Sequence, residues 1–173
     1  MKISDILANR ILPFEIEDEK LKKLFSFYLY SAPTIESKSA AMIEKEKLAE
    51  NWYEYKSTIP ENMIAVYSAS YPNEKLVDAF ERCGLNDDAS VNRRTKGFVC
   101  KRKEKKKGED PEPECNCLLR HLRNAIAHDS VYLLNGGNRK YILFEDFNMN
   151  NRITARMLFS QADLAAMKRT IMK

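Results

Sequence analysis

Residues 115–128 read Cys-Asn-Cys-Leu-Leu-Arg-His-Leu-Arg-Asn-Ala-Ile-Ala-His, and this stretch is the most strongly patterned part of the chain. Leu119, Leu122, Ala125 and Ile126 recur at the three- and four-residue spacing of one helical face. The remaining positions are mostly polar or basic. The pattern predicts an amphipathic helix that buries one side in a core and ends near residue 128.

The hydrophobic period changes to two immediately after this helix. Two apolar runs at 131–134 and 141–144 flank the sequence Asn135-Gly136-Gly137-Asn138, whose glycines can adopt positive φ in a tight turn. A third run, 153–159, can extend this hairpin. Ser160 and Asp163 have the spacing of a capping box, which predicts a final helix.

The part of the chain before residue 85 has mainly helical patterns. We expect a short helix near residue 5, a helix from the cap residue Asp18 to the Ala32-Pro33 dipeptide, a helix over about 37–55, and two shorter helices between residues 61 and 84. The aromatic cluster of Trp52, Tyr53 and Tyr55 could stack on bases, but its helical spacing favours core or dimer packing.

Periodicity is absent between residues 86 and 114, which predicts a flexible charged loop inserted between helices. A basic block at 101–107 is followed by an acidic, proline-bearing run at 109–114. The simplest interpretation is a solvated loop whose halves attract each other. The alternative is that the block binds an RNA backbone. Its basic residues are Lys101, Arg102, Lys103, Lys105, Lys106 and Lys107.

Length and composition favour a single domain over residues 1–173. The chain is 44% hydrophobic and carries a net charge of +4, a mild excess that helps approach to a polyanion. No run of eighteen apolar residues and no secretion signal is visible, so we expect a soluble, cytoplasmic protein without membrane contact. No Walker-type glycine-rich loop is present, which disfavours nucleotide hydrolysis.

The four cysteines are expected to be reduced thiols. They are Cys83, Cys100, Cys115 and Cys117. A structural zinc site is disfavoured, because one intervening residue between Cys115 and Cys117 is not a usual zinc spacing and the other two lie far away in sequence. We therefore expect no metal and no cofactor.

The chain has two histidines, His121 and His128, and both belong to the 115–128 helix. Histidine is the side chain whose ordinary pKa suits proton transfer near neutrality. Arg120, Asn124 and His128 are four residues apart and share one helical face, whereas Arg123 lies further round. Without further information, a solvated polar face is the simpler explanation of these residues.

The segment 122–128, Leu-Arg-Asn-Ala-Ile-Ala-His, resembles the signature of the HEPN superfamily: an arginine, a polar residue that is usually asparagine, and a histidine four to six residues after the arginine. The hairpin and the final helix resemble those of small prokaryotic HEPN proteins. The resemblance implies a mainly α fold, a helical bundle with a small antiparallel β-hairpin or sheet after the motif helix. It also implies a homodimer in which two motif helices face each other.

In active members of the superfamily, the cleft between the two facing motif helices of the homodimer cuts RNA without a metal. The resemblance implies that Arg123 binds the scissile phosphate, that Asn124 orients the site and that His128 is the general acid or base while a ribose 2′-hydroxyl attacks. Arg120 and His121 lie outside the motif and would have supporting roles. Family habit suggests a toxin or antiviral effector with an antitoxin or nucleotidyltransferase-type partner. The alternative is a non-catalytic module that binds RNA or a protein partner.

Overall fold

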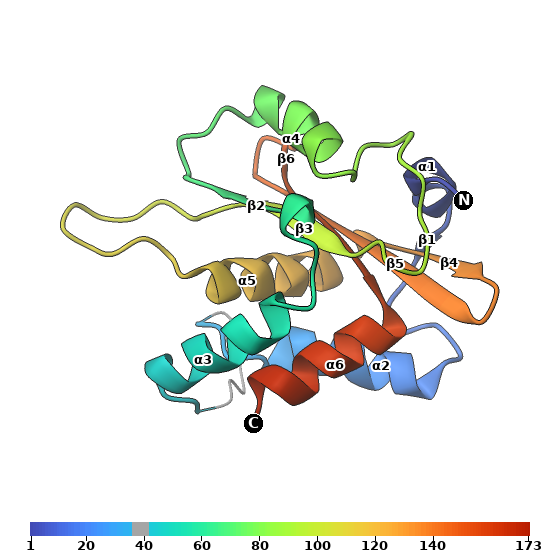
Figure 1. Cartoon of the computed structure of the whole chain (residues 1–173), viewed down its shortest axis with the longest axis horizontal. Coiled ribbons are helices and arrows are strands. Elements are labelled where there is room, and N and C mark those ends of the chain that lie inside the picture. Colours follow the sequence, from blue (N-terminus) through green and yellow to red (C-terminus); the bar gives the residue numbers. More distant parts are fainter. Residues whose placement is uncertain (36–41) are drawn as a thin grey trace.

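The computed structural model describes residues 1–35 and 42–173 and shows a six-stranded mixed sheet between two layers of helices (Figure 1). The strands are β1 (Arg10–Ile11), β2 (Ile64–Tyr67), β3 (Gly97–Lys101), β4 (Val131–Gly136), β5 (Arg139–Phe147) and β6 (Ile153–Ser160). The α-helices are α1 (Ile3–Leu7), α2 (Glu19–Ser26), α3 (Lys45–Lys56), α4 (Leu76–Arg82), α5 (Glu114–Ala127) and α6 (Gln161–Ile171). A π-helical turn over Phe27–Ser31 continues α2, and two 3-10 turns cover Glu61–Met63 and Asn73–Lys75.

The strand order in the sheet is β1-β4-β5-β6-β3-β2. The pairs are antiparallel except β2 with β3, which run parallel. The expected mainly α bundle with a small hairpin is therefore wrong: the hairpin strands β4 and β5 belong to a six-stranded sheet whose central strands are β5 and β6, and which also contains strands from the first two thirds of the chain.

Besides the two-residue β1, two strands lie where the sequence predicted none. β2 occupies part of the region in which we expected two short helices, of which only α4 is an α-helix. β3 lies inside the segment 86–114 that we expected to be a loop, and it is buried between β6 and β2. Both strands are short, and each is completed by partners that are distant in sequence, so local periodicity carries little signal for them.

The other expected elements are present. β4 and β5 form the predicted hairpin, with Gly137 at φ +63° in its turn, and β6 extends it. Ser160 and Asp163 form the predicted capping box of α6, with backbone-to-side-chain hydrogen bonds of 2.9 and 3.0 Å in the two directions. The helix expected over 37–55 is described from Lys45, and its expected residues 37–41 lie outside the described part of the chain.

Side chains alternate between the two faces of the sheet, so each face has its own core. Ile142 and Phe144 of β5 pack with α2, α3, α5 and α6, whereas Tyr141 and Leu143 pack with α1 and α4. Trp52 and Tyr55 are buried in the first core, as predicted for the aromatic cluster, and Tyr53 is exposed. The motif helix α5 is thus held against the sheet by its whole apolar face.

The alternation continues to two adjacent acidic residues of β5. The Glu145 carboxylate binds Arg156, directly opposite on β6, and Arg156 lies 4.7 Å from the ring centre of Phe80 on α4. The Asp146 side chain faces α5 instead. Neighbouring carboxylates therefore form their charge contacts on opposite faces of the sheet.

Candidate functional site

The C-terminal end of α5 presents the motif histidine. His128 caps the helix, and its backbone N–H donates to Asn124 at 3.0 Å. The next residue, Asp129, is left-handed at φ +56°, and the N–H of Ser130 donates back to the Ala125 carbonyl at 2.8 Å. This left-handed ending stops the helix, as is common for helix C-termini. The side chain of His128 is exposed, so it is accessible to a substrate.

The motif arginine and asparagine contact each other. Arg123 donates from Nη1 to the Asn124 side-chain oxygen at 3.1 Å, and both residues are half-buried. The Nε atom of Arg123 is buried and has no hydrogen-bond partner among the described residues. A buried donor without a partner costs about 1–3 kcal/mol. Because this Nε atom is enclosed by the protein, a substrate phosphate would have to bind the terminal nitrogens of the half-buried guanidinium.

Asp146 is the site residue that the sequence analysis missed. Its Oδ2 atom accepts hydrogen bonds from Asn124 Nδ2 at 3.1 Å and from His121 Nδ1 at 2.8 Å. Asp146 lies two residues beyond the predicted strand 141–144, and β5 extends to Phe147. The direction of its side chain was predictable only from the register of this longer strand. Both Asp146 and His121 are buried.

His121 is buried, with only 1% of its surface exposed, so a substrate in solution cannot reach it. Its second nitrogen, Nε2, lies 2.7 Å from the Lys101 carbonyl. Burial opposes the charged imidazole, but hydrogen bonds to Asp146 and Cys117 outweigh it and raise the pKa of His121 to about 9. His121 therefore supports the motif helix from beneath.

The Lys101 carbonyl, at the end of β3, is shared by several groups of α5. Besides His121, it accepts from Arg120 Nη2 at 3.1 Å and from the Cys117 thiol at 3.3 Å. One backbone carbonyl of β3 thus fixes three side chains of the motif helix, which ties the unpredicted strand to the site.

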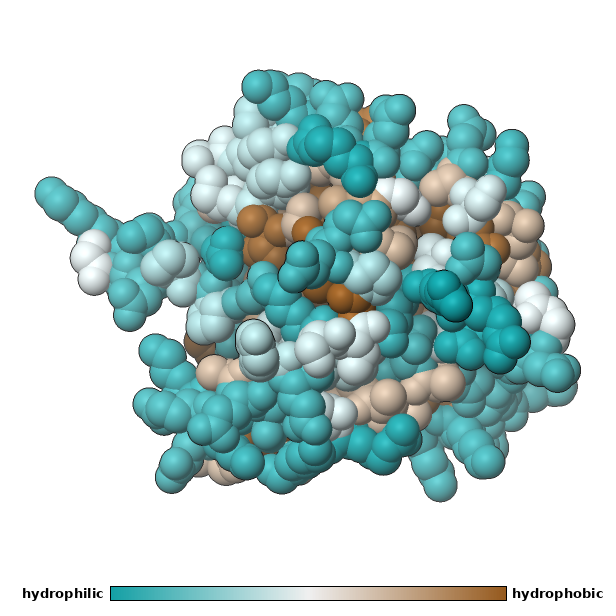
Figure 2. Space-filling view, in the orientation of Figure 1, coloured by the Kyte–Doolittle hydropathy of each residue, from teal (hydrophilic) through white to brown (hydrophobic). Residues whose placement is uncertain are grey.

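The segment between β3 and α5, residues 102–113, projects from the body and is called the arm below (Figure 1). Figure 2 shows it as a mostly hydrophilic protrusion. Its base is fixed by Glu112, which is paired with Arg120 and accepts from the Lys103 backbone at 3.2 Å. Burial opposes the ionisation of Glu112, but the Arg120 and Lys103 contacts outweigh it and lower its pKa.

The predicted RNA-binding residues of this region fall into two groups. Lys101 is bonded to Asn73, and Arg102 donates to the Glu112 carbonyl at 2.8 Å, so both are held by the protein. The other four are exposed on the arm. They are Lys103, Lys105, Lys106 and Lys107.

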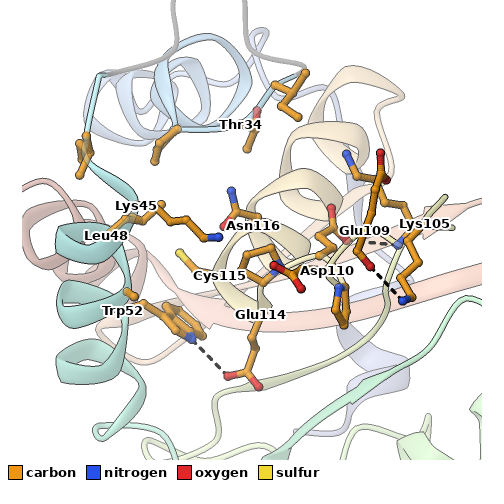
Figure 3. A pocket seen from close by; sticks show the side chains of 18 of the residues that line it. Thr34, Lys45, Leu48, Trp52, Lys105, Glu109, Asp110, Glu114, Cys115 and Asn116 are labelled. Carbon is orange, nitrogen blue, oxygen red and sulfur yellow. Dashed lines mark hydrogen bonds between the residues drawn. The ribbon is translucent and has the colours of Figure 1, made fainter. Parts of the chain in front are cut away.

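A cavity of about 710 Å³ lies between α3, the arm and the first turn of α5 (Figure 3). Leu48 and Trp52 line it from α3, Asp110 from the arm, and Glu114 and Cys115 from α5. The motif residues do not contribute to its lining. The cavity is therefore separate from the motif, although Lys103 and Lys105 of the arm also line it.

All four cysteines are buried and unbridged. Within residues 1–35 and 42–173 no group of three or more histidine, cysteine or acidic side chains has the arrangement of a metal site. In the same residues, no helix is both long and apolar enough to cross a bilayer.

Comparison with protein families supplies the decisive observation. The model of the family HEPN pEK499 p136 matches residues 11–172, which is nearly the whole chain and includes α5 with its motif. The chain belongs to this HEPN family. No curated protein and no solved structure matches it. HEPN membership indicates a nuclease or an RNA-binding module and confirms the resemblance noted in the 122–128 segment.

Proposed function

We propose that this HEPN protein is a metal-independent endoribonuclease. The observation that supports the proposal best is the arrangement on α5, which places an exposed His128 at the helix end and a half-buried Arg123 guanidinium, bonded to Asn124, one turn before it. A phosphodiester oxygen is a suitable acceptor for a guanidinium, which can donate two parallel hydrogen bonds.

In the proposed reaction the ribose 2′-hydroxyl attacks the neighbouring phosphorus atom and the bond to the 5′-oxygen breaks. His128 takes the 2′-hydroxyl proton or gives a proton to the departing 5′-oxygen, and a homodimer would supply one histidine for each step. Arg123 stabilises the charge on the phosphorus oxygens. The products are a 2′,3′-cyclic phosphate and a 5′-hydroxyl end.

A cellular role as a toxin or antiviral effector, held by an antitoxin or nucleotidyltransferase-type partner, is part of the same proposal and is supported by family habit alone. A second candidate, a non-catalytic RNA-binding module, is favoured by one observation, the exposed lysines of the arm. Under this alternative, RNA binding would survive the loss of His128.

The test is cleavage of total cellular RNA in the presence of chelator by the native protein and by His128→Ala. Removing a general acid or base is expected to reduce the rate by at least about 100-fold. Arg169→Ala, which changes an exposed arginine on α6, is the control for surface charge. Intact RNA with folded, dimeric native protein would reject the enzyme proposal and leave the binding module.

A further inference from the structure

We infer that Asp146 and His121 are positioning residues that set the orientation of the Arg123 guanidinium through the side-chain amide of Asn124. This inference rests on the proposed function of Arg123. Hydrogen bonds link the groups in one chain: His121 to Asp146 at 2.8 Å, Asp146 to Asn124 at 3.1 Å, and Asn124 to Arg123 at 3.1 Å. This series of hydrogen bonds begins at His121 in the buried core and ends at the motif residue Arg123.

The first link fixes a charged pair. Both ring nitrogens of His121 face oxygen acceptors, the Asp146 carboxylate and the Lys101 carbonyl. A neutral imidazole has only one N–H, so oxygen acceptors at 2.7 and 2.8 Å on its two sides favour the doubly protonated ring over a neutral ring whose Nε2 accepts from the more distant Arg120 Nη2 at 3.3 Å. The pKa of His121, raised to about 9, agrees with this state. The imidazolium lies 2.8 Å from the Asp146 carboxylate, so these two buried charges are paired.

The second link fixes the direction of the amide. An ionised carboxylate only accepts hydrogen bonds, so Asp146 selects the NH₂ side of Asn124. The carbonyl side of the amide must then point away from Asp146, where it accepts from Arg123 Nη1. With the amide reversed, its oxygen would face the carboxylate and its NH₂ group would face the guanidinium. Both contacts would be repulsive.

The third link determines where Arg123 directs its remaining donors. Its Nη1 atom is bound to Asn124, and its buried Nε atom has no partner among the described residues. A guanidinium is planar and rigid, so fixing one nitrogen restricts the plane in which the others can donate. Asp146 and His121 would thus control phosphate alignment without contact with the RNA.

The same residues also hold the fold together, so a test must separate positioning from stability. Glu145 is a suitable control, because it is the next residue of β5, is buried, and pairs with Arg156 on the opposite face of the sheet. Glu145→Gln and Asp146→Asn each remove one buried carboxylate charge from the same strand. Only Asp146→Asn removes a contact of the motif.

The experiment measures kcat and KM for RNA cleavage in these two variants at matched folded fractions. A misplaced reacting group costs on the order of 100-fold in rate, so Asp146→Asn should lower kcat by about that factor while KM changes little. Glu145→Gln should keep kcat within about threefold, if its effect is confined to stability. Equal losses in the two variants would overturn the inference.

A double-mutant cycle and a spectroscopic measurement complete the test. If Asp146 acts through Asn124, Asp146→Asn should lower kcat little further in an Asn124→Ala background. If the two substitutions instead lower kcat by the product of their separate factors, Asp146 does not act through Asn124. The NMR signal of Arg123 Nε should move or broaden in Asp146→Asn and stay unchanged in Glu145→Gln. This signal does not depend on cleavage, so an inactive native protein would reject the proposed function while the Arg123 signal still decides the positioning inference.

Discussion

The guanidinium of Arg120 and the carboxylate of Glu112 share two hydrogen bonds, from Nε to Oε2 at 2.8 Å and from Nη2 to Oε1 at 3.0 Å. This bidentate pair joins the end of the arm to the middle of the motif helix. Because Arg120 also binds the Lys101 carbonyl at the start of the arm, one side chain closes both ends of the projecting segment. The arm is therefore anchored to the helix that carries the motif.

Breaking this pair should weaken both the fold and the arm. We expect Glu112→Gln to lower the free energy of unfolding by about 3 kcal/mol, because it leaves the largely buried Arg120 charge without its counterion. Urea denaturation measures the loss, and limited proteolysis at the arm lysines should become faster. Glu109→Gln changes an exposed acidic residue of the arm and should cost less than about 0.5 kcal/mol. Equal stability of Glu112→Gln and the native protein would contradict the anchoring.

The exposed arm lysines should contribute to RNA affinity through their charge. We expect Lys106→Gln with Lys107→Gln to reduce the slope of log affinity against log salt by about 1.4 for single-stranded RNA, if each lysine contacts one phosphate. Fluorescence anisotropy at several salt concentrations provides the measurement. Lys20→Gln with Lys75→Gln removes the same charge from exposed positions on other elements and should leave the slope unchanged. Identical slopes for the two double variants would favour a merely solvated arm.

The stability contribution of His121 should depend on pH. Its pKa is raised from the ordinary 6.5 to about 9, so the folded protein binds a proton that the unfolded chain releases between these values. The stabilisation is therefore fully present below pH 6.5 and is lost as pH rises through 9, by on the order of 3 kcal/mol. We expect the difference in unfolding free energy between the native protein and His121→Gln to shrink over this range. A difference that stays constant from pH 6 to 10 would contradict a charged His121.

Gly97 should be indispensable for the pairing of β3 with the chain before β2. A Cβ atom at this position would lie 2.2 Å from the Met63 carbonyl oxygen, a backbone atom that cannot move without displacing the strand. We expect Gly97→Ala to cost at least about 3 kcal/mol and to reduce soluble yield, as measured by thermal unfolding. Gly108 lies in the arm at φ +86°, with no atom near a Cβ. Gly108→Ala should therefore lower the free energy of unfolding by only about 1 kcal/mol, the cost of an alanine in the left-handed backbone region. Similar melting temperatures for both variants would show that β3 accommodates the methyl group.

The sequence predicts the parts of this fold whose signals are local. The apolar face of α5, the glycine turn between β4 and β5, and the Ser160 capping box each depend on residues within one element or one turn, and each is present. The resemblance to the HEPN superfamily also rests on a local signal, because the motif residues lie within one helical segment, and the family match over residues 11–172 confirms it.

The remaining features depend on contacts between distant segments. β3 is a short apolar run between charged residues, and it is a strand because β6, more than fifty positions later, and β2 pair with it. Asp146 illustrates the same limit within the site. Only the register of β5 against α5 distinguishes it from its neighbour Glu145, and no spacing rule connects it to Asn124 or His121.

The two adjacent carboxylates of β5 also act as a check on strand alignment. The four residues 144–147 read Phe-Glu-Asp-Phe, with Glu145 opposite the Arg156 cation and Asp146 opposite the His121 cation. A slip of β5 by one position in one direction would place Phe144 against Arg156, and a slip in the other would place Phe147 against His121. In each misaligned sheet one buried cation would face a phenylalanine side chain and lack a counterion, which would destabilise the fold by several kcal/mol. The two ion pairs therefore form together only in the native register of β5. The same register also places Asp146 beside Asn124 of the motif.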